Sequence, residues 1–146
     1  MQPRNPMAEM RLAEAYNAAK ETESARRSLV RASELAPDLF PPRRSLALLA
    51  AQAGKFDEAV TIAREAQKRQ PREAAGFVLE GEVESLRKRW DAAIAALRAA
   101  QQRDANSNDV TVRLHAALLA GGKTADAERL SADWLKAHPK DGAFLY

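Results

Sequence analysis

The segments Phe56-Asp-Glu-Ala-Val-Thr-Ile-Ala63 and Trp90-Asp-Ala-Ala-Ile-Ala-Ala-Leu97 begin 34 residues apart. Both open with an aromatic residue and an aspartate, and both carry alanine at the fourth position. Alanine recurs at the same interval along the chain, at Ala25, Ala59, Ala93 and Ala127. Self-similarity at this period is typical of stacked helix–turn–helix units. The sequence therefore predicts an array of repeated helix pairs.

Proline follows the same interval where the predicted units end, at Pro37, Pro71 and Pro139, with Ala105 at the remaining position. Proline biases the residue before it away from helix, so it closes the second helix of a unit. We therefore divide a single array over residues 1–146 into units at about 6–39, 40–73, 74–107 and 108–141. Residues 142–146 are then expected to begin a fifth, truncated unit of a longer protein.

Each unit is predicted to contain two helices joined by a short turn. In the first unit we expect helices from Pro6 to about Lys20 and from Ser24 to Ala36. Gly54 and Gly122 can adopt a positive φ and so end the first helices of their units. Short turns require successive helices to pack antiparallel, and no strand-like alternation competes with the helical spacing. The predicted fold class is an all-α solenoid.

Composition excludes several classes of protein and site. The chain has no cysteine, which rules out disulfides, thiolate metal ligands and a cysteine nucleophile. No apolar run approaches the ~20 residues that cross a bilayer. The net charge of +3 is spread over short basic clusters interleaved with acidic residues, as on a solvated helix face. Nucleic acid is therefore not the partner we expect.

No set of residues with catalytic spacing is present in the sequence. Its two histidines, His115 and His138, lie in different predicted helices and lack a carboxylate at the spacing of a zinc motif. The stretch Gly121-Gly122-Lys123-Thr124 lacks the first glycine of a phosphate-binding loop and is interpreted as a turn between helices. Glu80 and Glu84 are expected to form ion pairs, including one from Glu84 to Lys88. We predict no enzymatic activity, no metal and no cofactor.

The repeats resemble the tetratricopeptide repeat (TPR) family. The matching residues are Leu12, Ala13, Tyr16, Ala25, Leu29, Ala32 and Pro37 in the first unit, Leu46, Ala47, Gly54, Phe56, Ala59, Ala66 and Pro71 in the second, and Phe77, Gly81, Trp90, Ala93, Leu97 and Ala100 in the third. The resemblance implies a right-handed superhelix whose first helices line a concave groove. It also implies a scaffold that binds a peptide or helix of a partner protein there.

Carried over by repeat phase, the groove surface consists of first-helix residues of all four units: Met10, Arg11, Glu14, Asn17, Arg44, Leu48, Gln52, Val78, Leu79, Glu82, Leu86, Val112, Arg113 and Leu119. Arg11, Arg44 and Arg113 are expected to be its cations and to pair with a carboxylate of the partner. The Lys/Asn clamp of chaperone-binding TPR domains is not present at these positions. The alternative prediction is a structural spacer that self-associates through Phe144, Leu145 and Tyr146.

Four positions depart from the family pattern. Glu80 and Glu84 stand where the family packs Leu and Tyr, His115 fills a normally small site, and Trp134 replaces a small residue. We expect Leu79 and Val83 to take the buried face and the two glutamates to point outward.

A second resemblance concerns the cellular compartment. The run Trp134-Leu-Lys-Ala-His-Pro-Lys-Asp141, followed by Phe-Leu-Tyr, resembles bacterial TPR lipoproteins associated with PEP-CTERM/exosortase sorting. That resemblance implies a bacterial, periplasmic protein, and without it a cytoplasmic location is the remaining prediction.

Overall fold

The computed structural model describes residues 5–140, in which eight α-helices follow one another. Their bounds are α1 Pro6–Ala18, α2 Thr22–Leu35, α3 Phe40–Gln52, α4 Phe56–Arg69, α5 Ala75–Leu86, α6 Trp90–Arg103, α7 Asn108–Ala120 and α8 Thr124–Ala137. The two similar segments that begin at Phe56 and Trp90 are the starts of α4 and α6. The first two helices end one or two residues earlier than expected, and α2 begins two residues earlier.

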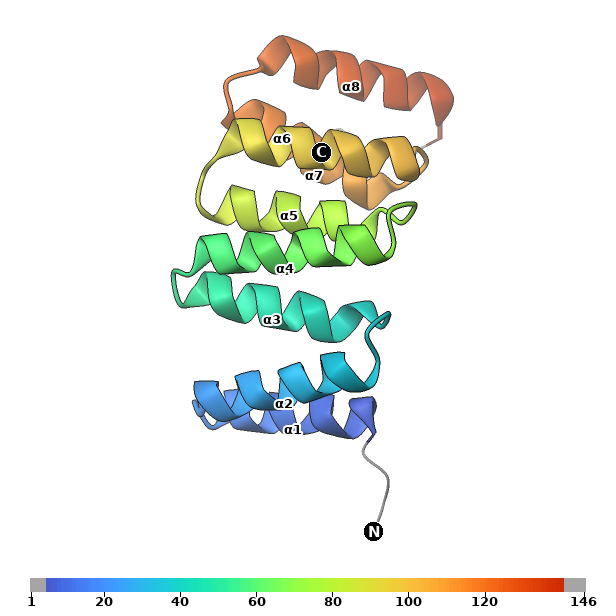
Figure 1. Ribbon diagram of the computed structural model, residues 1–146. Helices are drawn as coiled ribbons and strands as arrows, with labels where there is room; N and C mark the ends of the chain where they lie inside the picture. Colours follow the sequence, from blue (N-terminus) through green and yellow to red (C-terminus); the bar gives the residue numbers. More distant parts are fainter. Residues whose placement is uncertain (1–4, 141–146) are drawn as a thin grey trace. The chain divides into compact units, whose positions relative to one another are not determined.

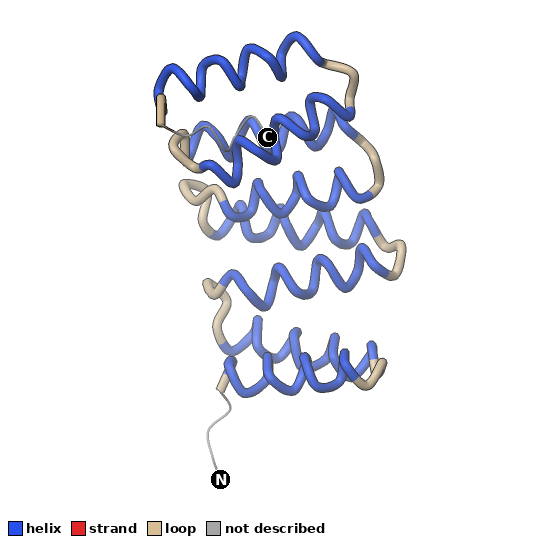
Figure 2. Tube along the Cα trace, turned by 180° about the vertical axis from the view of Figure 1, so that it is seen from behind, coloured by secondary structure: helices blue, strands red, loops and turns tan. Residues whose placement is uncertain are grey.

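The chain divides into two compact units between Pro71 and Arg72. In the first unit α1 packs against α2, α2 against α3, and α3 against α4. In the second unit α5 packs against α6, α6 against α7, and α7 against α8. Successive helices within each unit run antiparallel, as the short turns require (Figure 1). Figure 2 shows from the opposite side how short these loops are.

The turn inside each predicted repeat has the same backbone conformation. A residue with positive φ follows the first helix in all four cases, at Lys20 (62°), Gly54 (78°), Lys88 (60°) and Gly122 (77°). The next residue donates its N–H to a carbonyl five residues earlier, as Lys123 does to Leu118 at 2.8 Å. This is the Schellman motif, which satisfies carbonyls left unpaired at a helix C-terminus. The prediction for Gly54 and Gly122 is confirmed, and Gly121-Gly122-Lys123-Thr124 is the turn between α7 and α8.

Small residues form the helix contacts of both units. Ala25, Ala59, Ala93 and Ala127 are all at most 1% exposed, so the recurring alanine is a core position. In the second unit these small residues pack beside Leu97, Leu114 and Leu118, which join α6 to α7. Each of these leucines is almost fully buried and contributes roughly 1.5–3 kcal/mol of hydrophobic stabilisation. The core therefore fixes the helix pairs and leaves one side of each first helix exposed.

Candidate functional site

A pocket in the first unit brings together residues of α1 and α3 that the sequence assigns to the groove surface. Its volume is about 120 Å³. Ala13, Ala25, Leu29, Ser45 and Leu49 line it together with five of the predicted groove residues, namely Met10, Glu14, Asn17, Leu48 and Gln52. Ala25 and Leu29 of α2 are buried and make the apolar floor. The lining is thus mainly apolar and includes one carboxylate, two amides and one hydroxyl.

The two arginines predicted for this part of the surface do not line the pocket. Arg11 lies on α1 and Arg44 on α3, and both side chains are exposed. An ion pair ties α1 to α2: Arg31 Nε lies 3.2 Å from Glu9 Oε2, whose side chain is only 12% exposed. This contact positions the helix that supplies Met10, Glu14 and Asn17.

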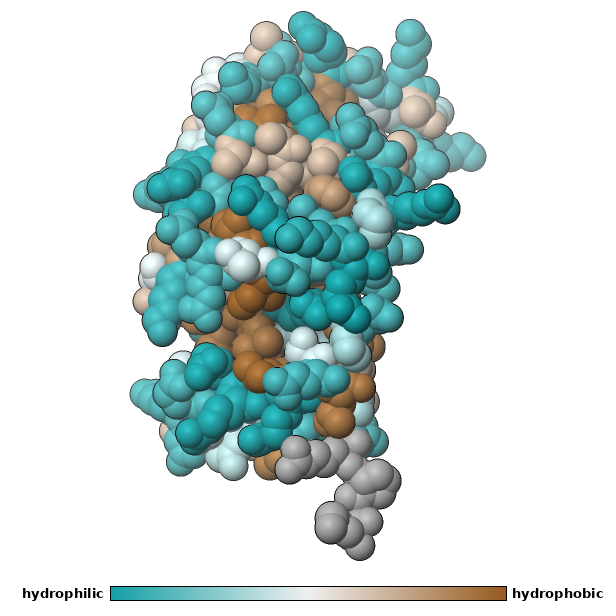
Figure 3. Space-filling model, in the orientation of Figure 1, coloured by the Kyte–Doolittle hydropathy of each residue, from teal (hydrophilic) through white to brown (hydrophobic). Residues whose placement is uncertain are grey.

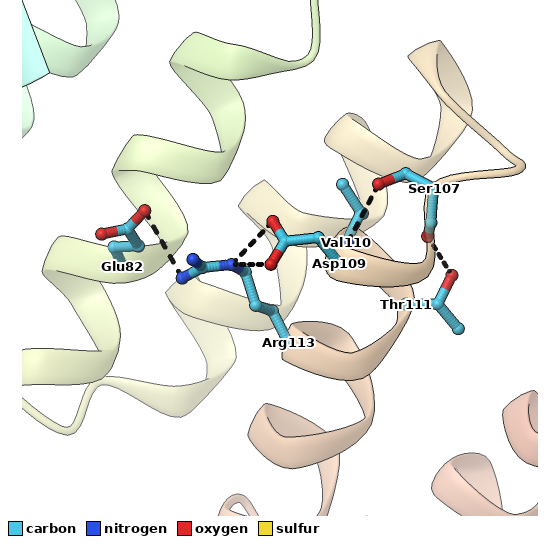
Figure 4. A network of polar contacts seen from close by, with 6 residues as sticks. All are labelled: Glu82, Ser107, Asp109, Val110, Thr111 and Arg113. Carbon is cyan, nitrogen blue, oxygen red and sulfur yellow. Dashed lines mark hydrogen bonds and ion pairs between the residues drawn. The ribbon is translucent and has the colours of Figure 1, made fainter. Parts of the chain in front are cut away.

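In the second unit, Arg113 of α7 lies between two carboxylates (Figure 4). Its Nη1 is 3.4 Å from Glu82 Oε1 of α5, and its Nε is 3.0 Å from Asp109 Oδ2 one turn earlier on α7. The start of α7 is held by Ser107, whose hydroxyl oxygen accepts a hydrogen bond from the Val110 N–H at 3.2 Å. Arg113 was expected to pair with a carboxylate of the partner, but its guanidinium already contacts two carboxylates of the chain itself.

Around this network the first helices of the second unit expose apolar side chains. Leu86 of α5 is 57% exposed, and Val112 and Leu119 of α7 are 44% and 47% exposed. Val78 is half-buried. We name the surface made by Val78, Glu82 and Leu86 of α5 with Asp109, Val112, Arg113, Ala116 and Leu119 of α7 the α5–α7 face.

One predicted groove residue belongs to the core instead. Leu79 is only 1% exposed, so its side chain cannot contact a partner in this conformation. Repeat phase had placed both Val78 and Leu79 on the groove surface, and of the two only Val78 is partly exposed. The expectation that Leu79 and Val83 are buried is confirmed, since Val83 is 0% exposed.

The expectation that Glu80 and Glu84 both point outward is wrong for Glu84, which is 3% exposed. Its carboxylate is neutralised by Arg87, with Nη2 2.6 Å from Oε1. The expected pair with Lys88 does not form, because α5 ends at Leu86 and Lys88 takes the positive φ of the turn. Glu80 is half-buried.

Trp134 and His115 also depart from the family pattern, and Trp134 packs at the end of α8. Trp134 is buried, and its ring stacks on His138 with centroids 3.9 Å apart. His138 caps the C-terminus of α8, with Nδ1 3.1 Å from the Trp134 carbonyl oxygen. His115 is half-buried on α7. Phe144, Leu145 and Tyr146, predicted to mediate self-association, lie outside the described residues.

Two further pockets lie on other sides of the units. One of about 520 Å³ is lined by Lys88, Arg89, Trp90, Asp91 and Ala92, with Ala120 and Gly121 from the end of α7. A smaller one of about 40 Å³ lies between α2 and α3, where Leu46, Leu49, Ala50 and Ala53 line it. On the face drawn in Figure 3, apolar surface is visible between these two helices, framed by polar side chains.

Residues 5–140 contain no cluster of three or more His, Asp or Glu side chains that could hold a metal ion. Within the same range, no helix combines the length and the apolar character that crossing a membrane requires.

No protein-family model matches the sequence, and a comparison with curated proteins also gives no match. Solved structures do match. TTC0263, a TPR protein of Thermus thermophilus, is 20% identical with a TM-score of 0.73, over 98% of this chain and 79% of its own. MamA of Desulfovibrio magneticus RS-1 is 12% identical with a TM-score of 0.71, over 94% and 78%. An O-GlcNAc transferase mutant of Thermobaculum terrenum is 22% identical with a TM-score of 0.66, over 94% of this chain but only 27% of its own. The chain therefore has the TPR fold, an all-α solenoid of repeated helix pairs.

Proposed function

We propose that this chain is a non-enzymatic protein-interaction scaffold that binds a peptide or helix of a partner protein on its first helices. One observation carries the proposal: five groove residues predicted from repeat phase line a single pocket between α1 and α3. The TPR fold supports it, because the family resemblance implies protein recognition on the same helices. The bacterial lipoprotein resemblance and the compartment it implies remain predictions.

The pocket has the size and character of a site for one apolar side chain. A volume of about 120 Å³ holds a residue such as leucine or methionine but not a whole helix. Burying such a side chain there contributes roughly 1.5–3 kcal/mol to binding before the cost of ordering the partner. Met10 is unbranched and polarisable, so it adapts to different occupants. Asn17, Ser45 and Gln52 can exchange hydrogen bonds with the partner's backbone.

The test uses a phage library of random peptides selected against the wild-type protein. Selected clones are then assayed against Leu48→Asp, which puts a charge into the pocket, and against Leu35→Asp. Leu35 is a matched control, because it is exposed on α2 in the same unit and does not line the pocket. Circular dichroism confirms that both variants are folded.

We expect most selected peptides to lose at least tenfold in affinity for Leu48→Asp and to keep their affinity for Leu35→Asp. A tenfold loss corresponds to about 1.4 kcal/mol, less than the burial of one leucine supplies. Clones that bind Leu48→Asp as tightly as wild type would contradict the proposal, and so would a selection that enriches no peptide.

A further inference from the structure

The α5–α7 face holds three of the six large apolar side chains that residues 5–140 expose, namely Leu86, Val112 and Leu119. On α7, Val112, Ala116 and Leu119 are spaced by four and three residues, and all three are exposed. Residues at this spacing lie along one side of a helix. Apolar side chains that gather on one side of a helix, rather than being scattered singly, are typical of surfaces that bind another protein.

The net charge of the α5–α7 face has the opposite sign to that of the whole protein. The face carries two carboxylates, Glu82 and Asp109, against one guanidinium, Arg113, and so has one negative charge in excess. The protein as a whole has a net charge of +3. Among the predicted groove residues of the first unit the balance is reversed, with Arg11 and Arg44 against Glu14.

The geometry of Arg113 determines which partner charge this face prefers. Glu82 and Asp109 already contact the guanidinium at 3.4 and 3.0 Å, so a partner carboxylate would have to compete with both. A partner cation meets two carboxylates without displacing either from Arg113. Glu82 is only 14% exposed on its side chain, so its interactions are less screened by water than those of a fully exposed carboxylate.

We propose that the α5–α7 face binds an amphipathic helix that carries lysine or arginine beside its apolar stripe. The partner helix lays its apolar side chains on Val112, Ala116 and Leu119, and its cations lie next to Glu82 and Asp109. Ala116 in the middle of the stripe lets the two helix backbones approach closely. In this mode of recognition, the anchors are apolar side chains of the partner helix that are spaced by about one helical turn. This inference rests on the proposed function, because it names the partner class for part of the same surface.

The probes are two synthetic peptides of about 18 residues, long enough to form helix in the bound state. They share one leucine stripe and differ only in the flanking residues, which are lysine in the first and glutamate in the second. We expect the lysine peptide to bind the full chain at least tenfold more tightly than its glutamate twin at low ionic strength. The difference should shrink as salt is added.

Variants of the two charge signs should act in opposite directions. Glu82→Gln should weaken binding of the lysine peptide roughly threefold to tenfold, and Arg113→Gln should strengthen it by a similar factor, because the face then carries two unbalanced carboxylates. Asp109→Asn is the second acidic variant. The side chain of Asp109 is more exposed than that of Glu82, so its substitution disturbs the fold less. Leu119→Asp should weaken binding more than tenfold, whereas Leu35→Asp, a matched leucine on α2, should leave it unchanged.

Failure of this inference is distinguishable from failure of the proposed function. If the glutamate peptide binds as tightly as the lysine peptide, if neither binds, or if Arg113→Gln weakens binding of the lysine peptide, the inference is wrong. The scaffold function would still stand if library peptides depend on Leu48 in the first unit. The affinity of the library peptides could instead be independent of Leu48 while the lysine peptide binds and responds to the variants as described. In that case the assignment of the pocket as a binding site is wrong, and the inference about the α5–α7 face stands.

Discussion

The guanidinium of Arg87 lies 2.6 Å from the carboxylate of Glu84, and the two side chains are only 14% and 4% exposed. A pair withdrawn this far from water loses much of the hydration that stabilises each charge. Removing one partner leaves the other buried and uncompensated.

We predict that Arg87→Met lowers the free energy of unfolding by about 3–5 kcal/mol, because the carboxylate of Glu84 then lacks its cation. The double variant Glu84→Leu/Arg87→Met should recover most of this loss, since leucine already occupies the equivalent repeat position at Leu118. Urea unfolding of the wild type, both single variants and the double variant measures the coupling. Equal destabilisation in the single Arg87→Met and the double variant would show that the buried charge is not the cause.

The positive-φ positions of the turns give a second prediction. A residue other than glycine in the left-handed region destabilises the folded state by roughly 1–2 kcal/mol. Glycine avoids this cost, but its greater conformational entropy in the unfolded state offsets part of the gain. Lys88→Gly should therefore stabilise the protein by about 0.5–1 kcal/mol. Gly122→Ala should destabilise it by about 1 kcal/mol, although its added Cβ would meet no atom within 4 Å. Thermal unfolding checks both; stabilisation by Gly122→Ala would show that backbone strain does not govern these turns.

A third prediction concerns Gly81, where α5 approaches α6. A Cβ added there would lie 2.7 and 2.8 Å from Cγ and Cδ2 of Leu97. Although alanine favours helix, Gly81→Ala should destabilise the protein by about 1–3 kcal/mol because this contact is overpacked. Adding Leu97→Val should restore part of the loss, and Leu97→Val alone is the control. A stabilised Gly81→Ala variant would mean that α5 can move away from α6 at little cost.

The fourth prediction tests the start of α7, which supplies Asp109 and Arg113. Ser107→Ala removes the acceptor of the Val110 N–H and should cost about 1 kcal/mol in chemical denaturation. Ser107→Asn keeps an acceptor oxygen at this position and should remain close to wild type. The same loss in both variants would assign the effect to something other than the cap.

Features that depend on local spacing could be predicted from the sequence. Gly54 and Gly122 ended their helices where expected because the turn needs a positive φ, which glycine adopts at low cost. Lysine carries no turn signal of its own, so the same conformation at Lys20 and Lys88 is indicated only by their 34-residue intervals to the two glycines.

Features that depend on contacts between helices were less predictable. Repeat phase placed the neighbours Val78 and Leu79 together on the groove surface, whereas packing buries Leu79 and leaves Val78 partly exposed. The burial of Glu84 depends on Arg87, which lies in the turn where helical spacing rules no longer apply. Likewise, the balance of Arg113 by Glu82 joins residues 31 positions apart on α5 and α7. These are the places where three-dimensional packing adds information to the repeat pattern.

The buried alanines have a consequence for how this protein can be changed. In the second unit, Ala93 and Ala127 hold the helix pairs together from within, and neither side chain reaches the surface that a partner would touch. Val112, Ala116 and Leu119 stand outside that framework. Substitutions of these exposed residues, in evolution or by design, can therefore change which partner is bound while the helix packing stays intact.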